Sequence, residues 1–205
     1  MLRFAQADVC STIAQGKKRF EAWKSGEEMH QNLRAVVLNM SIANGGQSEY
    51  NAVKEEYLKS NSANDKEACL QALGRSTDPK VARDLLEFVT SEDVPIQDSH
   101  YGASAISANN STRDEMWKFT KTQWKRLNDR LAVSNIVMDR WMKTGLINYS
   151  DFGIESEISE FFKDKDTRAY ERSLVVISDT IKGNAKYKQR DEKLVLEWLE
   201  VKGYV

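Results

Sequence analysis

Apolar side chains recur at helical spacing along almost the whole chain. The clearest stripe consists of Tyr170, Leu174, Ile177 and Ile181. Steps of three and four residues place side chains on one face of an α-helix. The other segments with this pattern cover residues of about 4–24, 30–44, 50–57, 68–73, 81–89, 112–131, 133–145, 154–162 and 194–201, with a weaker one at 97–108. No convincing strand pair appears, so the pattern predicts an all-α chain of about eleven helices.

The size of the repeating unit suggests how these helices are arranged. Pairs of predicted helices recur every 35–45 residues or so, without a strict sequence repeat. Units of this size are typical of a HEAT/armadillo-like α-solenoid, in which antiparallel helix pairs stack and leave a concave inner face. An ordinary helical bundle is the structural alternative.

Composition supports a single helical domain over residues 1–205. Apolar residues make up 40% and charged residues 30%, with only ten glycines and two prolines. A chain of this length buries roughly 70% of its unfolded surface, so it needs no disulfide or metal to fold. The two cysteines, Cys10 and Cys69, are expected to be free thiols, and no apolar run approaches the length of a membrane span.

Two helix starts carry recognisable signals. In "ALGRSTDPK", Gly74 is predicted to end one helix in the left-handed conformation, and Asp78 and Pro79 to cap and begin the next. Thr112 and Glu115 match a capping box that would open one long helix to about residue 131.

Arg75, beside the first break, has two interpretations. It could interact with the negative end of the preceding helix or pair with a nearby carboxylate. Alternatively, its guanidinium could point into the concave face and bind a carboxylate in bidentate fashion.

No catalytic motif is apparent in this chain. The only histidines, His30 and His100, are far apart, with no HExxH pair to converge on zinc. There is no GxSxG elbow and no phosphate-binding loop. Nucleic-acid binding is disfavoured because the net charge is −1 and because Trp117 and Trp124 share a helical face away from the neighbouring lysines. We therefore expect no catalytic residue and no metal ligand in this chain.

Several segments together resemble the C-terminal domain of zinc aminopeptidases of the puromycin-sensitive and endoplasmic-reticulum types. The segments are "NLRAVVLNMSIANGGQSEYNAVKEEY", "ALGRSTDPKVARDLLEFVTSEDVPIQD", "MWKFTKTQWKRL" and "ISEFFKDKD". The shared elements are Asn32–Arg34, Gly45–Gly46, Leu73–Arg75, Gln97–Asp98, Trp117 with Trp124, and Phe161–Phe162. The resemblance runs from about residue 30 to the end of the chain.

The resemblance implies a noncatalytic lid over the active site of a larger enzyme. In this family the C-terminal domain is a HEAT-like solenoid that encloses a peptide chamber, while a separate catalytic domain holds the zinc ion with its HExxH motif and GAMEN loop. The implied partners are the other domains of that enzyme and its peptide substrate, with no nucleic acid and no membrane. By resemblance, Arg75 lines the cavity and contacts the peptide's C-terminal carboxylate.

Two departures from the family pattern affect the assignment of this role to Arg75. The other groups that would bind the carboxylate lie upstream of this chain, and Gln31 stands where the family commonly has proline. The sequence shows no secretory pattern, and we expect a cytoplasmic location. A free-standing helical-repeat adaptor that binds a protein on its concave face remains the alternative.

Overall fold

The computed structural model describes the backbone of residues 2–204 and the side chains of residues 10–204. Within that part the fold is entirely helical, which confirms the predicted fold class. The helices are α1 (Leu2–Lys24), α2 (Gln31–Ala43), α3 (Gln47–Lys59), α4 (Ala63–Leu73), α5 (Pro79–Val89), the 3₁₀ turn η1 (Ile96–Asp98), α6 (Ser99–Ala108), α7 (Arg113–Thr122), α8 (Trp124–Leu131), α9 (Asn135–Leu146), α10 (Phe152–Phe162) and α11 (Glu171–Val201).

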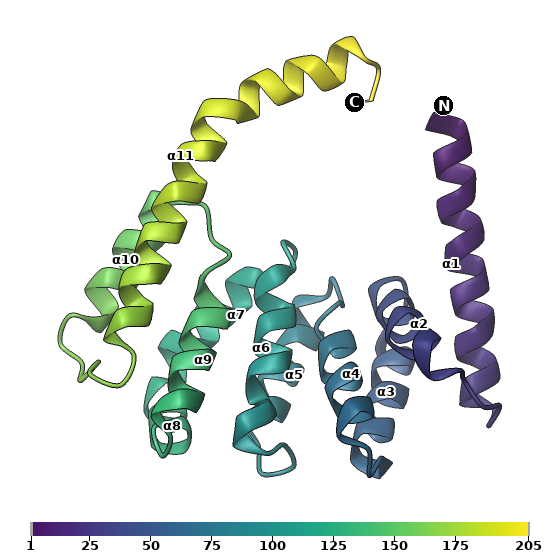
Figure 1. Cartoon of the computed structure of the whole chain (residues 1–205), viewed down its shortest axis with the longest axis horizontal. Helices are drawn as coiled ribbons and strands as arrows, with labels where there is room; N and C mark the ends of the chain where they lie inside the picture. Colours follow the sequence, from purple (N-terminus) through teal and green to yellow (C-terminus); the bar gives the residue numbers. More distant parts are fainter. Residues whose placement is uncertain (1, 205) are drawn as a thin grey trace.

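The helices stack in two layers along an arc (Figure 1). In one layer, α2, α4, α6, α9 and α11 pack against each other in that order. The other layer contains α3, α5, α7 and α10. It is linked by the ion pairs Lys54–Asp84, Arg83–Glu115 and Lys121–Glu157. The helices from α2 to α7 and from α9 to α11 thus alternate between layers, as the predicted solenoid requires, and α8 connects α7 to α9.

One continuous apolar core runs between the layers. Its largest fully buried side chains include Tyr50, Tyr57 and Trp141. Each large apolar side chain buried in this way contributes about 1.5–3 kcal/mol relative to exposure. Because each unit buries its apolar face only on its neighbours, the array depends on contacts that pass from one unit to the next.

The predicted long helix of residues 112–131 is in fact two helices. Gln123 leaves helical geometry, with φ −107° and ψ 17°, and separates α7 from α8. Trp117 on α7 lies 5.3 Å from the ring of Phe161, and Trp124 on α8 lies 5.1 Å from that of Phe162, measured between centroids. The shared aromatic cluster joins the two helices to α10 across the break.

The predicted capping box at the start of α7 is wrong. Thr112 makes no side-chain capping hydrogen bond, and its hydroxyl is buried without a partner. The Glu115 carboxylate instead forms an ion pair with Arg83 on α5, 2.9 Å away. Glu115 therefore pairs with Arg83 on a neighbouring helix instead of capping its own helix. A capping arrangement occurs elsewhere, where the Gly46 amide donates to the Glu49 carboxylate at 2.7 Å.

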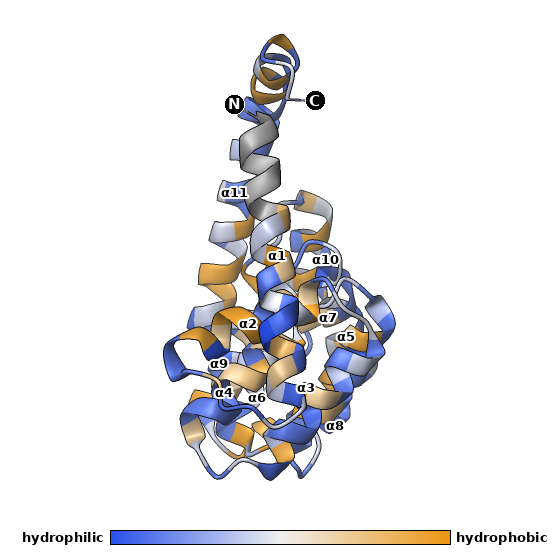
Figure 2. Cartoon of the chain, turned by 90° about the vertical axis from the view of Figure 1, so that its right-hand side faces the viewer, coloured by the Kyte–Doolittle hydropathy of each residue, from blue (hydrophilic) through white to orange (hydrophobic). Residues whose placement is uncertain are grey.

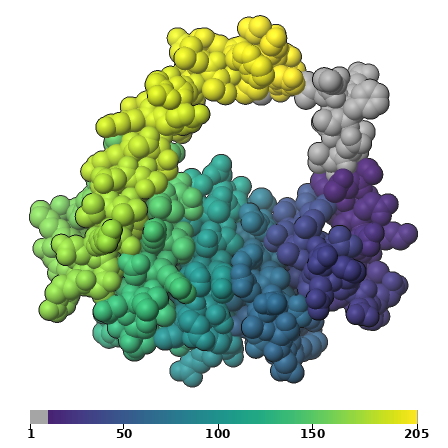
Figure 3. Space-filling model, viewed as in Figure 1, coloured from purple at the N-terminus to yellow at the C-terminus, as the bar shows by residue number. Residues whose placement is uncertain are grey.

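The last two predicted helices form one continuous helix, α11. The polar stretch between them contains no proline, and the i,i+4 ion pairs Lys188–Glu192 and Lys193–Glu197 support the helix there. No residue described beyond Ala185 is buried. We call residues 186–204 the arm, because they project away from the solenoid body (Figure 3).

Candidate functional site

Four interhelical loops lie at one edge of the solenoid, on the side toward which the arm projects (Figure 1). They are residues 44–46, 74–78, 109–112 and 147–151, and we call them the upper rim. Figure 2 places the arm above the same edge after a quarter turn. A ligand held between the arm and the body would therefore meet these loops.

Three asparagine side chains tie the upper rim together. Asn109 donates to the Ser76 carbonyl at 2.8 Å. Asn148 donates to the Ser107 hydroxyl at 3.1 Å, and Asn184 on α11 donates to the Tyr149 carbonyl at 3.1 Å. The residues joined lie 33, 41 and 35 positions apart in sequence, close to the predicted repeat length. Each bond fixes one unit of the solenoid against the next.

The "ALGRSTDPK" joint begins in a way the sequence did not predict. Gly74 has φ −76°, so it is not in the left-handed region. A Cβ at this position would overlap the Cβ of Ala105 on α6 and lie 3.0 Å from the Ile106 nitrogen. Glycine is therefore required because α4 and α6 approach closely, rather than because of backbone conformation.

The second half of the joint matches the prediction. Asp78 accepts a hydrogen bond from the Lys80 amide at 2.8 Å, and Pro79 occupies the first helical position of α5. Both features are local, since a cap and a preset φ act within a few residues of the helix start.

Arg75 is exposed on the upper rim. Its backbone amide donates to the Ala72 carbonyl at 2.9 Å. Its guanidinium forms no ion pair with any residue that the structure describes. The pairing with a nearby carboxylate that the sequence left open is therefore not observed, and the charge of Arg75 stays available at the rim.

Arg113, which sequence reasoning did not single out, is a second rim cation held only by neutral groups. Its Nε donates to the Ser107 carbonyl at 2.7 Å, and Nη2 donates to the Asn110 side chain at 2.6 Å. The guanidinium carbon lies 5.9 Å from the Tyr149 ring centroid. Nothing local in the sequence marks this arrangement, because Tyr149 comes from another unit.

Arg34, away from the rim, has its charge paired. Arg34 joins three helices by forming ion pairs with Glu56, at 2.9 Å, and with Asp65. Its side chain is only 17% exposed, so these pairs are largely shielded from water. Their role is to fasten α2 to α3 and α4, unlike the unpaired arginines of the rim.

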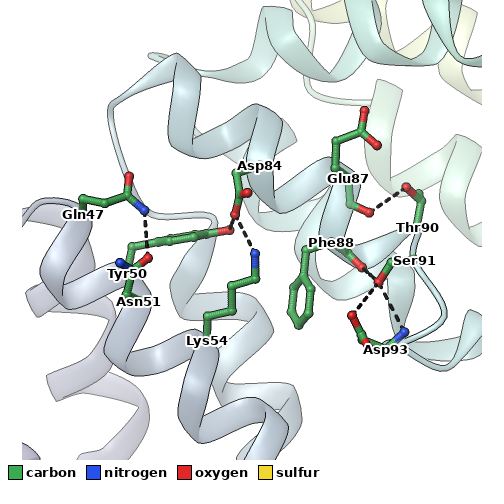
Figure 4. A network of polar contacts seen from close by, with 10 residues as sticks. All are labelled: Gln47, Tyr50, Asn51, Lys54, Asp84, Glu87, Phe88, Thr90, Ser91 and Asp93. Carbon is green, nitrogen blue, oxygen red and sulfur yellow. Dashed lines mark hydrogen bonds and ion pairs between the residues drawn. The ribbon is translucent and has the colours of Figure 1, made fainter.

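The second layer carries a polar network around a surface cavity of about 430 Å³ (Figure 4). Asp84 accepts from the Tyr50 hydroxyl at 2.6 Å and from the Lys54 ammonium at 2.8 Å. Burial alone would raise the pKa of Asp84, but these hydrogen bonds lower it below its usual value. The Lys54 ammonium also lies 4.6 Å from the Phe88 ring centroid. The network satisfies its own charges, so it serves to join α3 to α5.

No catalytic metal centre is assembled within the described residues, since no group of three or more His, Cys, Asp or Glu side chains is placed to hold an ion. His30 caps α2 by accepting from the Asn32 amide, and His100 on α6 contacts the Gln97 carbonyl of η1. No helix described here is long and apolar enough to cross a membrane.

Comparison with known proteins identifies the family. The chain matches the ERAP1-like C-terminal domain over residues 1–183. It is 25% identical to Aminopeptidase 2 of Candida albicans over 203 residues, covering 98% of this chain and 22% of that protein. It is 28% identical to mitochondrial Aminopeptidase 2 of Saccharomyces cerevisiae over 189 residues, covering 91% and 20%.

A mammalian relative gives the same result. Aminopeptidase N of Canis lupus familiaris is 25% identical over 203 residues, covering 93% of this chain and 20% of that protein. The chain thus spans about a fifth of the length of the relatives it matches. The family model matches most of the chain, and the fold is a helical solenoid. The chain belongs to the ERAP1-like C-terminal domain family.

Proposed function

We propose that this chain is the noncatalytic C-terminal lid and substrate-chamber domain of a zinc-dependent aminopeptidase that removes N-terminal residues from peptides. Its family membership and its coverage of only a fifth of aminopeptidase relatives support this role. The partners would be the other domains of the parent enzyme and the peptide substrate.

The observation that best supports a chamber is the space between the arm and the upper rim. In the space-filling view α11 arches away from the body and leaves an opening beneath it (Figure 3). The ends of several helices face that opening (Figure 1). A catalytic domain placed over this side would enclose the space and exclude bulk water from a bound peptide.

Arg75 is the residue we propose to contact the peptide's C-terminal carboxylate. It is exposed on the rim and free of any ion pair within the described part of the chain. A guanidinium can donate two parallel hydrogen bonds to a carboxylate, and such charge-assisted bonds contribute about 1.5–3 kcal/mol. With the peptide amine held near the zinc ion, this contact would make turnover sensitive to peptide length.

The zinc ion would reside in the rest of the parent enzyme. The described residues offer no converging set of His, Cys, Asp or Glu ligands, and a catalytic zinc site needs three such ligands. The role of this chain is to bind and orient substrate, without taking part in proton transfer or nucleophilic attack. We also propose that the parent enzyme is cytoplasmic, which a tagged full-length protein would test by microscopy.

The test compares peptides that differ only at their C-terminus. In the full-length enzyme, Arg75→Ala should raise KM about tenfold or more for free-acid peptides of eight or more residues, and have little effect on their amidated counterparts. Arg168→Ala is the matched control, since Arg168 is also exposed but pairs with Asp166 in the distant α10–α11 loop. Equal responses of acid and amide peptides would eliminate the carboxylate contact.

The wider proposal has its own test. The isolated chain should bind no stoichiometric zinc and should not hydrolyse an aminoacyl-anilide substrate, whereas the full-length protein should do both. Turnover by the isolated chain would contradict a noncatalytic role. A full-length protein without aminopeptidase activity would instead favour the helical-repeat adaptor.

A further inference from the structure

The arm carries large apolar side chains that nothing in the structure covers. Leu194 is 63% exposed, Trp198 54% and Val201 84%. Tyr187, Val195, Leu196 and Tyr204 are also exposed. Proteins rarely leave a contiguous group of such side chains in water unless the surface binds a partner. Figure 2 shows these apolar segments on the arm, above the body.

Four of these apolar side chains form a stripe along one side of the helix, whereas Leu196 lies on the opposite side. Tyr187, Leu194, Trp198 and Val201 follow each other at steps of seven, four and three residues. The other sides carry charges paired along the helix, such as Lys188–Glu192 and Lys193–Glu197. The arm is therefore an amphipathic helix of the kind that lays its apolar side into a groove.

This stripe is distinct from the surface by which α11 packs on the body. In the first half of α11, Ile177, Ile181 and Ala185 are buried against the solenoid. With about 100° of rotation per residue, the stripe of Leu194 and Trp198 is turned roughly 120° from those residues. The arm therefore does not extend the body-packing surface, and its apolar side is directed elsewhere.

The position of α1 indicates which partner meets this surface. The family is a C-terminal domain and the chain spans about a fifth of its relatives, so most of such a protein precedes this segment. The described start of α1 lies on the same side of the molecule as the arm (Figure 1). Polypeptide entering through α1 would arrive beside the arm.

We propose that the apolar side of the arm docks into an apolar groove on the preceding part of the same polypeptide. This inference rests on the proposed function only in assuming a longer parent protein. Docking would fix the lid to the rest of the enzyme at its far end, while α1 connects it at the other. The lid would then be attached to the rest of the enzyme at two places, the arm and α1, which lie on either side of the upper rim.

Hydrogen exchange tests the proposal directly. Backbone amides of residues 188–200 should exchange at least tenfold more slowly in the full-length protein than in the isolated 205-residue chain. The double variant Leu194→Ser/Trp198→Ser should abolish that difference. The control Lys188→Ser/Lys193→Ser changes the charged sides of the same helix and should retain it. Val201→Ser alone provides a milder variant should the double variant fail to fold.

Two outcomes would overturn the proposal. Equal exchange of the arm in the full-length protein and in the isolated chain would show that nothing upstream covers it. Concentration-dependent dimerisation of the isolated chain, lost in Leu194→Ser/Trp198→Ser, would assign the surface to a second copy. Anilide hydrolysis is measured in parallel: an active enzyme with an unprotected arm refutes only docking, and an inactive protein with a protected arm refutes only the proposed function.

Discussion

Replacing Gly74 by alanine tests whether close approach of α4 and α6 determines this position. The added methyl group would overlap the Ala105 Cβ and lie 3.0 Å from the Ala105 carbonyl carbon and the Ile106 nitrogen. Two of these three contacts are backbone atoms of α6, which cannot move away as a flexible side chain would. Overpacking of this kind costs about 1–3 kcal/mol.

The expected change is large enough for thermal or chemical denaturation. For a domain of 150–250 residues, each kcal/mol lowers Tm by about 2–4 °C, so Gly74→Ala should lower it by roughly 4–8 °C for a cost near 2 kcal/mol. The slope of unfolding free energy against denaturant should stay unchanged, because the surface exposed on unfolding is the same.

Gly183 on α11 is the matched control. A Cβ there would meet nothing within 4 Å, and alanine is favoured over glycine inside a helix by about 1 kcal/mol. Gly183→Ala should therefore stabilise the protein slightly. Adding Ala105→Gly should reduce the cost of Gly74→Ala, since it removes one of the overlapping groups. If Gly74→Ala behaves like Gly183→Ala, the close-approach explanation is wrong.

Three further predictions concern charged and titratable groups. Arg34→Met should lower the free energy of unfolding by about 2–4 kcal/mol, because Glu56 and Asp65 lose their shared, shielded partner. Removing Arg168 from its fully exposed pair with Asp166 should have a much smaller effect, because water screens that pair, and equal losses would refute this. Burial raises the pKa of Glu155, but hydrogen bonds from two serines and a lysine lower it on balance, so its stabilisation exists above the unfolded pKa of about 4.3 and disappears as pH falls below it. Glu155→Gln should thus flatten the loss of stability between about pH 5 and pH 3 in denaturation curves, and an unchanged curve would contradict this. Burial raises the pKa of the Cys69 thiol to about 12, so a thiol reagent at neutral pH should modify one cysteine of the native protein at once and the second only after denaturant is added; two fast thiols would show that Cys69 is accessible.

The resemblance seen in the sequence supplied the family, and the physical reading of the residues independently supplied the helical solenoid. Arg75 was singled out from the sequence as an arginine beside a helix break, and its role stays a proposal. Arg113 could not have been found, because its neutral environment combines Ser107 and Asn110 with Tyr149, 36 residues further on. Arg113 stands out only in the folded chain, where the groups around its guanidinium are neutral.

The sequence by itself determined the all-helical class, the approximate positions of most helices and the start of α5 at Asp78 and Pro79. Apolar periodicity and helix caps act over a few residues, so they can be read without knowing the neighbours. Only the tertiary structure decided why position 74 is glycine, where Glu115 finds its partner, and that α11 continues into the arm. For position 74 and for Glu115 the deciding contact comes from another unit of the solenoid, which the local sequence does not record. In α11 the helix continues because ion pairs along it support the stretch where the apolar stripe is interrupted.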